Sequence, residues 1–313
     1  MITMPYFSVI IPLYNKENFI QNTVNSVLNQ SFLDFELIII DDCSTDNSLM
    51  KLNKFKDSIQ IIKHTTNKGL SATRNTGIIN SKAEYIAFLD ADDLWKETFL
   101  EEIFILINKF PNASLFATNY EEFVNAKTTI LPKNGAYKFE QNSQINDFFI
   151  KSLYQPLYCP SSFCVKKDVF DTIGLYNTSI TFGEDVDFNI RANLAYNLAY
   201  SNRPLVQYVI YSENQITQGK LSSKILTDFD FYDQIDVNIS LKKFLDFQRY
   251  TKAKQYKIEN NFRLFDKLKR NINLSNLNWK QIILLFSPRF ILILTKRIKI
   301  LFLKIGIRFT TYD

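Results

Sequence analysis

Short apolar runs alternate with segments of helical periodicity along the first hundred residues of this chain. Each run is apolar on both faces, which is typical of a buried strand. The strands predicted in this way span residues 7–12, 35–40, 58–64 and 85–89, and the helices between them span 16–30, 46–55 and 71–81. This alternation predicts a parallel sheet with right-handed crossovers, whose ligand site lies at the carboxyl ends of the strands.

The second half of the chain has a weaker pattern that mixes strands with helices. It predicts helices at 98–109, 145–152, 167–173 and 185–195, and short strands at 114–118 and 163–165. Gly174 closes the third of these helices, as glycine commonly does. From about residue 222 the periodicity is helical, with Pro288 as its clearest break. We therefore expect an α/β domain over 1–220 and a helical extension over 221–313.

Three carboxylates within four residues follow the fourth predicted strand: Asp90, Asp92 and Asp93. Like charges this close raise one another's pKa unless a cation or hydrogen-bond donors offset them. Oxygen ligands suit Mg²⁺ or Mn²⁺, which are commonly held by one or two carboxylates together with the phosphates of a substrate. The alternative is that Asp92 or Asp93 caps a helix that begins near Trp95.

Four polar loops follow the four predicted strands, and together they form a mouth with charges of both signs. They span residues 12–15, 41–46, 67–75 and 90–93. A nucleoside diphosphate would use all of them: a carboxylate would accept hydrogen bonds from the base or ribose, and Arg74 with a metal would balance the phosphates. Gly69 would let the backbone approach closely. Taken singly, each loop also fits an ordinary turn.

Five sequence blocks resemble the signature of the family 2 glycosyltransferases, which have the GT-A fold. The blocks are SVIIPLYN (8–15), IIDDCSTD (39–46), NKG followed by ATRN (67–75), FLDADD (88–93) and GED (183–185). They stand in the usual order of that family, and the resemblance spans about residues 5 to 215. It implies a nucleotide-binding α/β/α sandwich with a mixed, mainly parallel sheet. This GT-A domain would span residues 1–220 and would be followed here by the helical C-terminal extension.

The resemblance implies a role for each matching residue. Asp42 would contact the base, Arg74 and Asn67 would help to hold the nucleotide, and Asp90 would lie near the ribose. Asp92, together with Asp90, would ligate Mn²⁺ or Mg²⁺ at the diphosphate. The same donor site would be lined by Pro12, Tyr14, Asn15 and Gly69.

Glu184 and Asp185 stand at the start of a predicted helix and supply the remaining chemistry. Sugar transfer requires a base that deprotonates the acceptor hydroxyl while the nucleoside diphosphate leaves with metal help. By resemblance, Asp185 is the candidate base of one inverting displacement, and Glu184 would orient the acceptor or the base. The alternative is that both acids only favour the amino terminus of the helix.

The expected activity is transfer of a single hexosyl or N-acetylhexosaminyl group from a nucleotide sugar, expected to be a UDP-sugar. The acceptor would be a hydroxyl of a glycan or lipid-linked glycan in surface polysaccharide synthesis. Processive synthesis is disfavoured because the Gln-x-x-Arg-Trp block of processive members is missing. Residues 208–212 also lack the arginine and histidine that many relatives carry there. A non-catalytic sugar-nucleotide-binding or scaffold protein of the same fold is the alternative. A dinucleotide-dependent oxidoreductase is excluded because no G-x-G-x-x-G spacing occurs.

Charge is distributed unevenly along the chain, and basic residues are concentrated in the C-terminal extension. Residues 267–312 contain ten Lys or Arg and no acid, whereas the rest of the chain is slightly acidic, which argues against a nucleic-acid partner. Basic residues gather on one side of a helix over 289–308 and leave a broad apolar face. We expect this tail to lie on an anionic membrane surface, with docking on the protein itself or a partner subunit as the alternative.

Cysteine and histidine usage bounds the remaining chemistry. Cys43, Cys159 and Cys164 lack metal-ligand spacing, so zinc is not expected. We expect a reduced cytoplasmic setting, with the protein located peripherally on the inner face of the cell membrane. His64 is the only histidine and is expected at the surface, at a strand end. The oligomeric state does not follow from the sequence.

Overall fold

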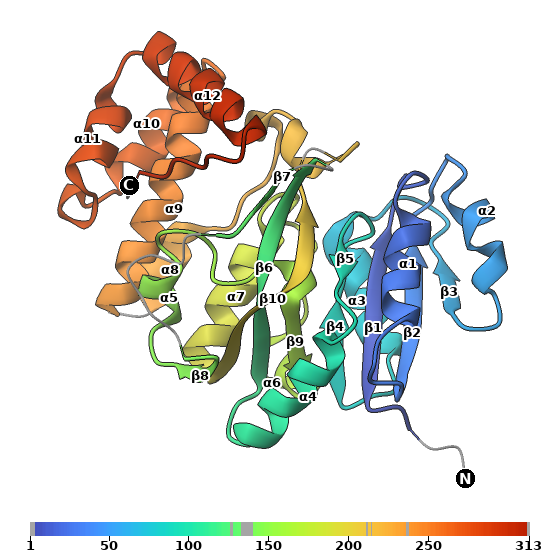
Figure 1. Cartoon of the computed structure of the whole chain (residues 1–313). Helices are drawn as coiled ribbons and strands as arrows, with labels where there is room; N and C mark the ends of the chain where they lie inside the picture. The colour runs from blue at the N-terminus through green and yellow to red at the C-terminus, as the bar shows by residue number, and fades with distance from the viewer. Residues whose placement is uncertain are drawn as a thin grey trace.

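The computed structural model describes residues 4–125, 128–132, 140–210, 212–213, 215–235 and 238–311. Its centre is a ten-stranded mixed sheet in the order β3-β2-β1-β4-β9-β6-β10-β5, with β7 added beside β6 and β8 beside β10. Helices cover the sheet, and a group of C-terminal helices packs beside it (Figure 1). The expected sandwich with a mixed sheet and a helical C-terminal region is confirmed.

The parallel half of the sheet is the part predicted most closely by the sequence. It consists of β1 (Phe7–Leu13), β2 (Phe35–Asp41), β3 (Gln60–Lys63) and β4 (Tyr85–Phe88), which all pair in parallel. Every residue of β1 is buried because helices cover both of its faces. The four strands therefore end at one edge, where their polar loops meet.

Helices link these strands in the predicted order. They are α1 (Ile20–Leu28), α2 (Ser48–Leu52) with the short helix η1 (Asn53–Phe55), α3 (Leu70–Asn80) and, after β4, α4 (Phe99–Lys109). Gly77 of α3 faces β1 so closely that an added Cβ would lie 2.5 Å from Ile10 Cγ2. Only glycine lets α3, which carries Arg74, approach the sheet to this depth.

The second half of the sheet was only partly predicted. It contains β5 (Leu94–Trp95), β6 (Leu115–Asn125), β7 (Thr128–Ile130), β8 (Asn142–Ile145), β9 (Phe163–Lys166) and β10 (Leu198–Val209). The long strand β10 was not predicted, because Pro204 interrupts its pattern and the ladder with β6 shifts register there. A helix capped by Asp92 or Asp93 near Trp95 was wrong: the segment is β5, and α4 begins at Phe99 after Thr98.

Helices of the middle region pack on this half of the sheet. They are α5 (Phe148–Lys151), α6 (Val169–Ile173) and α7 (Glu184–Ala195), with the short helix η2 (Pro160–Ser162) before β9. The helix expected over 145–152 is restricted to α5, because the residues before it form β8 beside β10. Gly174 ends α6 with φ of 78°, a left-handed conformation that glycine adopts without strain.

The C-terminal region is helical, as predicted from residue 222 onward. It contains the helices α8 (Phe229–Ile235), α9 (Ile239–Ile258), α10 (Phe262–Arg270), α11 (Trp279–Phe286) and α12 (Arg289–Lys304), and the short helices η3 (Ile216–Gln218), η4 (Leu221–Ser223) and η5 (Leu274–Asn276). Phe229, Tyr232 and Phe244 belong to the same hydrophobic core as Phe188 of α7. The helical region thus continues the core of the α/β fold.

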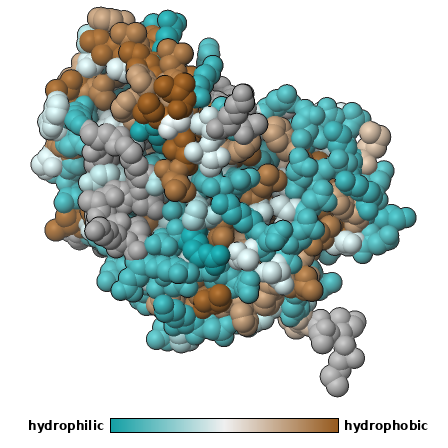
Figure 2. All heavy atoms as spheres, viewed as in Figure 1, coloured by the Kyte–Doolittle hydropathy of each residue, from teal (hydrophilic) through white to brown (hydrophobic). Residues whose placement is uncertain are grey.

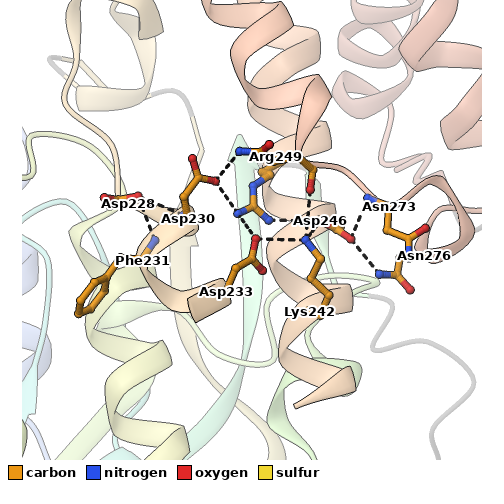
Figure 3. Close-up of polar contacts among 10 residues, drawn as sticks. Asp228, Asp230, Phe231, Asp233, Lys242, Asp246, Arg249, Asn273 and Asn276 are labelled. Atoms are coloured by element: carbon orange, nitrogen blue, oxygen red, sulfur yellow. Dashed lines mark hydrogen bonds and ion pairs between the residues drawn. The ribbon is translucent and has the colours of Figure 1, made fainter. Parts of the chain in front are cut away.

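A buried charge network joins α8, α9 and the segment before α11 (Figure 3). Arg249 is fully buried, and its guanidinium donates to Asp246 at 3.2 Å, Asp230 at 2.8 Å and Asp233 at 2.5 Å. Asp246 also accepts a hydrogen bond from Asn276 at 2.8 Å. Such a network fixes α8 against α9. Because α8 also contacts α7, the network holds α9 in place relative to α7 as well.

The tail helices α11 and α12 dock on α9 and still expose a large apolar face. Leu285 and Leu292 are buried in this contact. Pro288 separates the two helices as predicted. The outer face of the two helices exposes large hydrophobic side chains, namely Trp279, Ile283, Phe286, Phe290, Leu294, Ile298 and Leu301. Figure 2 shows apolar surface over the C-terminal helices. Among the described residues, no helix is long and apolar enough to cross a bilayer.

Candidate functional site

The loops after β1 and β2 are held together by Asn15. The side-chain oxygen of Asn15 accepts a hydrogen bond from the backbone N–H of Thr45 at 2.8 Å, and the backbone N–H of Asn15 donates to Ser44 Oγ at 3.1 Å. Asn15 and Cys43 have φ of 50° and 66°, which is uncommon for residues other than glycine. Left-handed residues of this kind are characteristic of functional loops. The two loops therefore form one preorganised wall.

Asp42 organises the next loop. Its carboxylate accepts hydrogen bonds from the backbone N–H groups of Lys68 and Gly69, both at 2.8 Å, and lies 2.7 Å from His64 Nδ1. The surface position expected for His64 was wrong: the imidazole is buried between Asp42 and Thr76, because the third strand ends directly beside Asp42. Asp42 thus attaches the loop before α3 to the end of β2.

Arg74 lies at the centre of the site and is almost fully buried. Its guanidinium donates to Asp90 at 2.8 Å and to Glu184 at 2.7 Å, so it bridges the loop after β4 and the start of α7. Burial raises the pKa of Asp90 and of Glu184, and the charge of Arg74 opposes this rise. One cation therefore holds two carboxylates in place, the partly buried Asp90 after β4 and the buried Glu184 at the start of α7.

Asp92 has a cation partner that the sequence did not reveal. Lys16 Nζ lies 2.8 Å from Asp92 Oδ2 and 2.7 Å from the backbone oxygen of Glu213, and Ser212 donates a hydrogen bond to the same carboxylate oxygen. The only sequence signal was the position of Lys16 directly after Asn15. Its contact with Asp92 spans 76 residues of chain.

Asp93 is the most deeply buried of the three carboxylates and has an architectural role. It accepts hydrogen bonds from Ser161 Oγ and from the backbone N–H of Val209, the latter at 2.8 Å. Burial, followed by the charges of Asp92 and Asp90, raises its pKa well above the ordinary range. Trp95 packs on Phe99 in the core and donates to the Ser161 backbone oxygen at 2.7 Å. These contacts connect η2 and β10 to the loop after β4.

Asp90 and Asp92 each have one carboxylate oxygen bound to a cation of the protein and one that is not. Arg74 binds Oδ1 of Asp90, and Lys16 binds Oδ2 of Asp92. The other two oxygens have no hydrogen-bond partner among the described residues. In this part of the chain, no cluster of three or more acidic, histidine or cysteine side chains could hold a metal alone. A metal here would therefore need oxygens from the phosphates of a substrate, as Mg²⁺ commonly does.

Helix α7 presents both candidate catalytic acids in its first turn. Glu184 is buried against Arg74, whereas Asp185 is half-buried. Gly183, with φ of 76°, provides the left-handed turn that leads into the helix. Farther along α7, Asp187 accepts a hydrogen bond from Tyr232 at 2.7 Å, which ties the helix to α8. The orientation of α7 thus depends on the C-terminal helices.

The remaining predicted donor-site residues lie around the same mouth. Pro12 is buried in β1, Gly69 precedes α3 with φ of 85°, and Tyr14 and Asn67 are exposed at the rim. All four belong to loops or strand ends at the carboxyl edge of the parallel strands. The structure therefore brings the predicted donor-site residues to one edge, with Arg74 linking them to α7.

The mixed sheet, with its polar loops gathered at the carboxyl edge of the parallel strands, defines an α/β fold of the GT-A class. The model of the family described as "Glycosyl transferase family 2" matches residues 8–174, more than half of the chain. The chain belongs to this family.

Curated relatives match over parts of their length. The chain is 33% identical to the poly(ribitol-phosphate) β-N-acetylglucosaminyltransferase TarP of Staphylococcus aureus over 76% of this chain and 68% of TarP. It is 42% identical over 101 residues to the putative teichuronic acid biosynthesis glycosyltransferase TuaG of Bacillus subtilis. It is 38% identical over 116 residues to the UDP-Glc:α-D-GlcNAc-diphosphoundecaprenol β-1,3-glucosyltransferase WfgD of Escherichia coli. The last two matches span 40% and 45% of the relatives.

Among solved structures, S. aureus TarS is similar over most of this chain. The structure of TarS residues 1–349 with UDP-GlcNAc superposes with a TM-score of 0.60 at 18% identity, over 90% of this chain and 78% of that one. At this identity the likeness establishes the fold, and it confirms the GT-A architecture.

Proposed function

We propose that this protein transfers a single sugar from a UDP-sugar to a hydroxyl of a glycan or lipid-linked glycan, with inversion, in the synthesis of a surface polysaccharide. The observation that carries the proposal is the bridge from Asp90 through Arg74 to Glu184, because it couples the donor loop to the helix that carries the candidate base. Family membership and relatives named for teichoic acid, teichuronic acid and lipid-linked glycan synthesis support it.

The donor would lie across the carboxyl ends of β1, β2 and β4. Tyr14 is 43% exposed at the rim, where its ring is available to the base. The loop that Asp42 fixes would complete the wall of the nucleotide site, so that Asp42 acts on the base through this loop or directly. Solved TarS structures hold UDP and UDP-GlcNAc, which supports a uridine nucleotide.

Asp90 and Asp92 would hold Mn²⁺ or Mg²⁺ through their two available oxygens. When bound, the metal would offset the charge of the departing diphosphate. Lys16 already places one positive charge on Asp92, so this residue balances the carboxylate before the donor arrives. Arg74 does the same for Asp90 and keeps the carboxylate oriented toward the mouth.

Asp185 would take the proton of the acceptor hydroxyl as that oxygen attacks the anomeric carbon from the face opposite the diphosphate. It lies in the first turn of a twelve-residue helix and is half-buried, so its carboxylate is accessible to an acceptor. Glu184 would position the helix end through Arg74.

Replacing Asp185 by Asn tests the assignment of the base. We expect turnover to fall by about 10² to 10⁴, the usual contribution of a positioned base, while UDP binding stays unchanged. Release of UDP from UDP-glucose and UDP-GlcNAc with membrane-derived acceptors measures the first, and a thermal shift with UDP and Mn²⁺ measures the second. The control is Asp171→Asn, an exposed acid on α6. Normal turnover in Asp185→Asn would reject the base, and absent wild-type turnover would favour a binding protein.

We assign sugar transfer to residues 1–220 and surface contact to the helical extension over 221–313. The exposed apolar face of α11 and α12, with basic side chains and no acid after Asp266 in the described part, suits an anionic membrane surface. This contact would hold the enzyme at the inner face of the cell membrane, where a lipid-linked acceptor is presented.

A further inference from the structure

Lys16 is held over Asp92 by three acceptors, one for each N–H of its ammonium group. Its Nζ atom lies 2.8 Å from Asp92 Oδ2, 3.2 Å from Ser212 Oγ and 2.7 Å from the backbone oxygen of Glu213. The backbone N–H of Lys16 donates to Ser48 Oγ at 2.9 Å. Because the side chain of Lys16 is only 11% exposed, this lysine is a fixed part of the mouth.

The contacts of Lys16 join the loop after β1 to the segment after β10. Asn18 Nδ2 donates to Glu213 Oε2 at 2.9 Å, which adds a second link between the same two segments. Ser212 donates a hydrogen bond to the Asp92 oxygen that Lys16 binds. Two donors therefore occupy Oδ2 of Asp92, and another cation can reach this oxygen only if Lys16 moves.

The charges at the mouth give a divalent cation little attraction before a nucleotide is bound. Arg74 pairs with Asp90 and Glu184, and Lys16 pairs with Asp92. These two cations and three carboxylates together carry one net negative charge. A metal on Oδ1 of Asp92 would also share that carboxylate with the ammonium group of Lys16, and like charges at such a separation repel strongly.

We propose that Lys16 keeps a divalent cation off Asp92 until a diphosphate enters, and thereby makes metal binding depend on the nucleotide. The inference rests on the metal site of the proposed function and adds the residue that controls it. A diphosphate brings negative charge and further oxygen ligands, which together offset the repulsion from Lys16. By reciprocity, the metal raises the affinity for the nucleotide by the same factor.

Titration of the full chain with Mn²⁺ without nucleotide, followed by the electron paramagnetic resonance signal of the free ion, tests this role independently of turnover. Lys16→Met should bind Mn²⁺ at least about tenfold more tightly than wild type does, because the competing charge is removed from Asp92. Lys16→Gln, which keeps a polar side chain, should show the same gain. Lys16→Arg keeps the charge and should bind Mn²⁺ as weakly as wild type.

A matched control and a double variant locate the effect. Lys63→Met removes an exposed lysine at the end of β3, on the same edge of the sheet, and should leave Mn²⁺ binding unchanged. Adding Asp92→Asn to Lys16→Met should abolish the gain, because the gain depends on that carboxylate. Thermal unfolding verifies that each variant is folded.

The same titration with UDP measures the dependence on the nucleotide, once the Mn²⁺ that UDP binds in solution is measured separately. UDP should tighten Mn²⁺ binding to wild type by about tenfold to a hundredfold, a usual size for coupling between two ligands. This factor should be smaller in Lys16→Met, because its metal site no longer needs the diphosphate to offset Lys16.

The proposal would be overturned if wild type binds Mn²⁺ without nucleotide as tightly as Lys16→Met does. An equal gain in Lys63→Met, or a gain that survives Asp92→Asn, would also overturn it. If UDP tightens Mn²⁺ binding to wild type while Lys16→Met gains nothing, the inference fails and the proposed function stands. If wild type binds no Mn²⁺ even with UDP, the metal of the proposed function fails together with the inference.

Discussion

At the scale of single residues, the site is governed by how buried carboxylates are balanced. Arg74 forms ion pairs with Asp90 and Glu184, and Lys16 forms an ion pair with Asp92. Asp93 has only hydrogen-bond donors, and its pKa rises well above the ordinary range because it is buried beside Asp92 and Asp90. The cations thus accompany Asp90, Asp92 and Glu184, whereas Asp93, which links η2 and β10 to the loop after β4, relies on hydrogen-bond donors.

Replacing Arg74 by Met should destabilise the protein by about 3 to 5 kcal/mol, because it leaves the buried Glu184 and the partly buried Asp90 without their cation. The folded-state pKa values of Asp90 and Glu184, already raised by burial, would rise further. The folded state then binds more protons than the unfolded state above about pH 4, so stability falls as pH rises. Urea unfolding at pH 5 and pH 8 measures this.

The loss in Arg74→Met should be larger at pH 8 than at pH 5, and adding Glu184→Gln should recover part of it. A deficit that does not change with pH, or no recovery in the double variant, would contradict the electrostatic role of Arg74. The double variant is the control for loss of packing, because it keeps Met at position 74.

Residue types and local order could be predicted from the sequence, whereas residue pairs could not. Asp90 and Asp92 were recognised as candidates because they stand in a polar block after a predicted strand, and Asp185 because its block resembles the family signature. The contacts of Arg74 with Glu184 and of Lys16 with Asp92 join positions 110 and 76 residues apart, and no local pattern encodes them. His64 was misplaced for the same reason: its partners, Asp42 and Thr76, are brought to it by the fold.

At the scale of elements, the parallel strands and their helices followed from periodicity, because each is buried in a regular way. Strand β10 did not, since Pro204 and a shifted ladder conceal it. Its pairing with β6 and β5 depends on contacts that are distant in sequence. The helices α8 and α9 were predicted as helices, but their packing on α7 was visible only in the structure, through Tyr232 and Asp187.

The network around Arg249 gives a prediction at this scale. Arg249→Met should lower the free energy of unfolding by about 3 to 5 kcal/mol, because the buried Asp246 would keep only Lys242 as a charge partner and Asp230 would lose its cation. Arg263→Met removes an exposed arginine of α10 and should change stability by less than about 0.5 kcal/mol. Chemical denaturation compares the two variants. Equal stability of both would show that the network does not hold α8 and α9 together.

At the scale of the whole molecule, the chain combines a polar mouth at the carboxyl edge of its sheet with an apolar and basic surface on its C-terminal helices (Figures 1 and 2). The tail docks on α9 and remains apolar on its outer face, so docking on the protein and contact with a membrane are compatible. The charge asymmetry in the sequence predicted the basic tail, but not which face of α12 would pack inward.

Replacing Phe290 and Leu301 by Ser should weaken sedimentation with anionic vesicles by more than about tenfold, because each buried side chain of this size contributes about 1.5 to 3 kcal/mol. Both are highly exposed, so the fold should be unaffected. The matched control is the double change Leu33→Ser, Met50→Ser, which removes two equally exposed hydrophobic residues outside the tail. If both double variants bind vesicles as well as wild type does, the tail is not the contact surface.

A crystal structure of the protein with UDP and Mn²⁺ tests the central claim most directly. The account predicts the uridine between Tyr14 and the loop fixed by Asp42, with the diphosphate and the metal at Asp90 and Asp92. The account would be contradicted by a nucleotide bound elsewhere, or by a bound nucleotide whose diphosphate and metal do not contact either carboxylate.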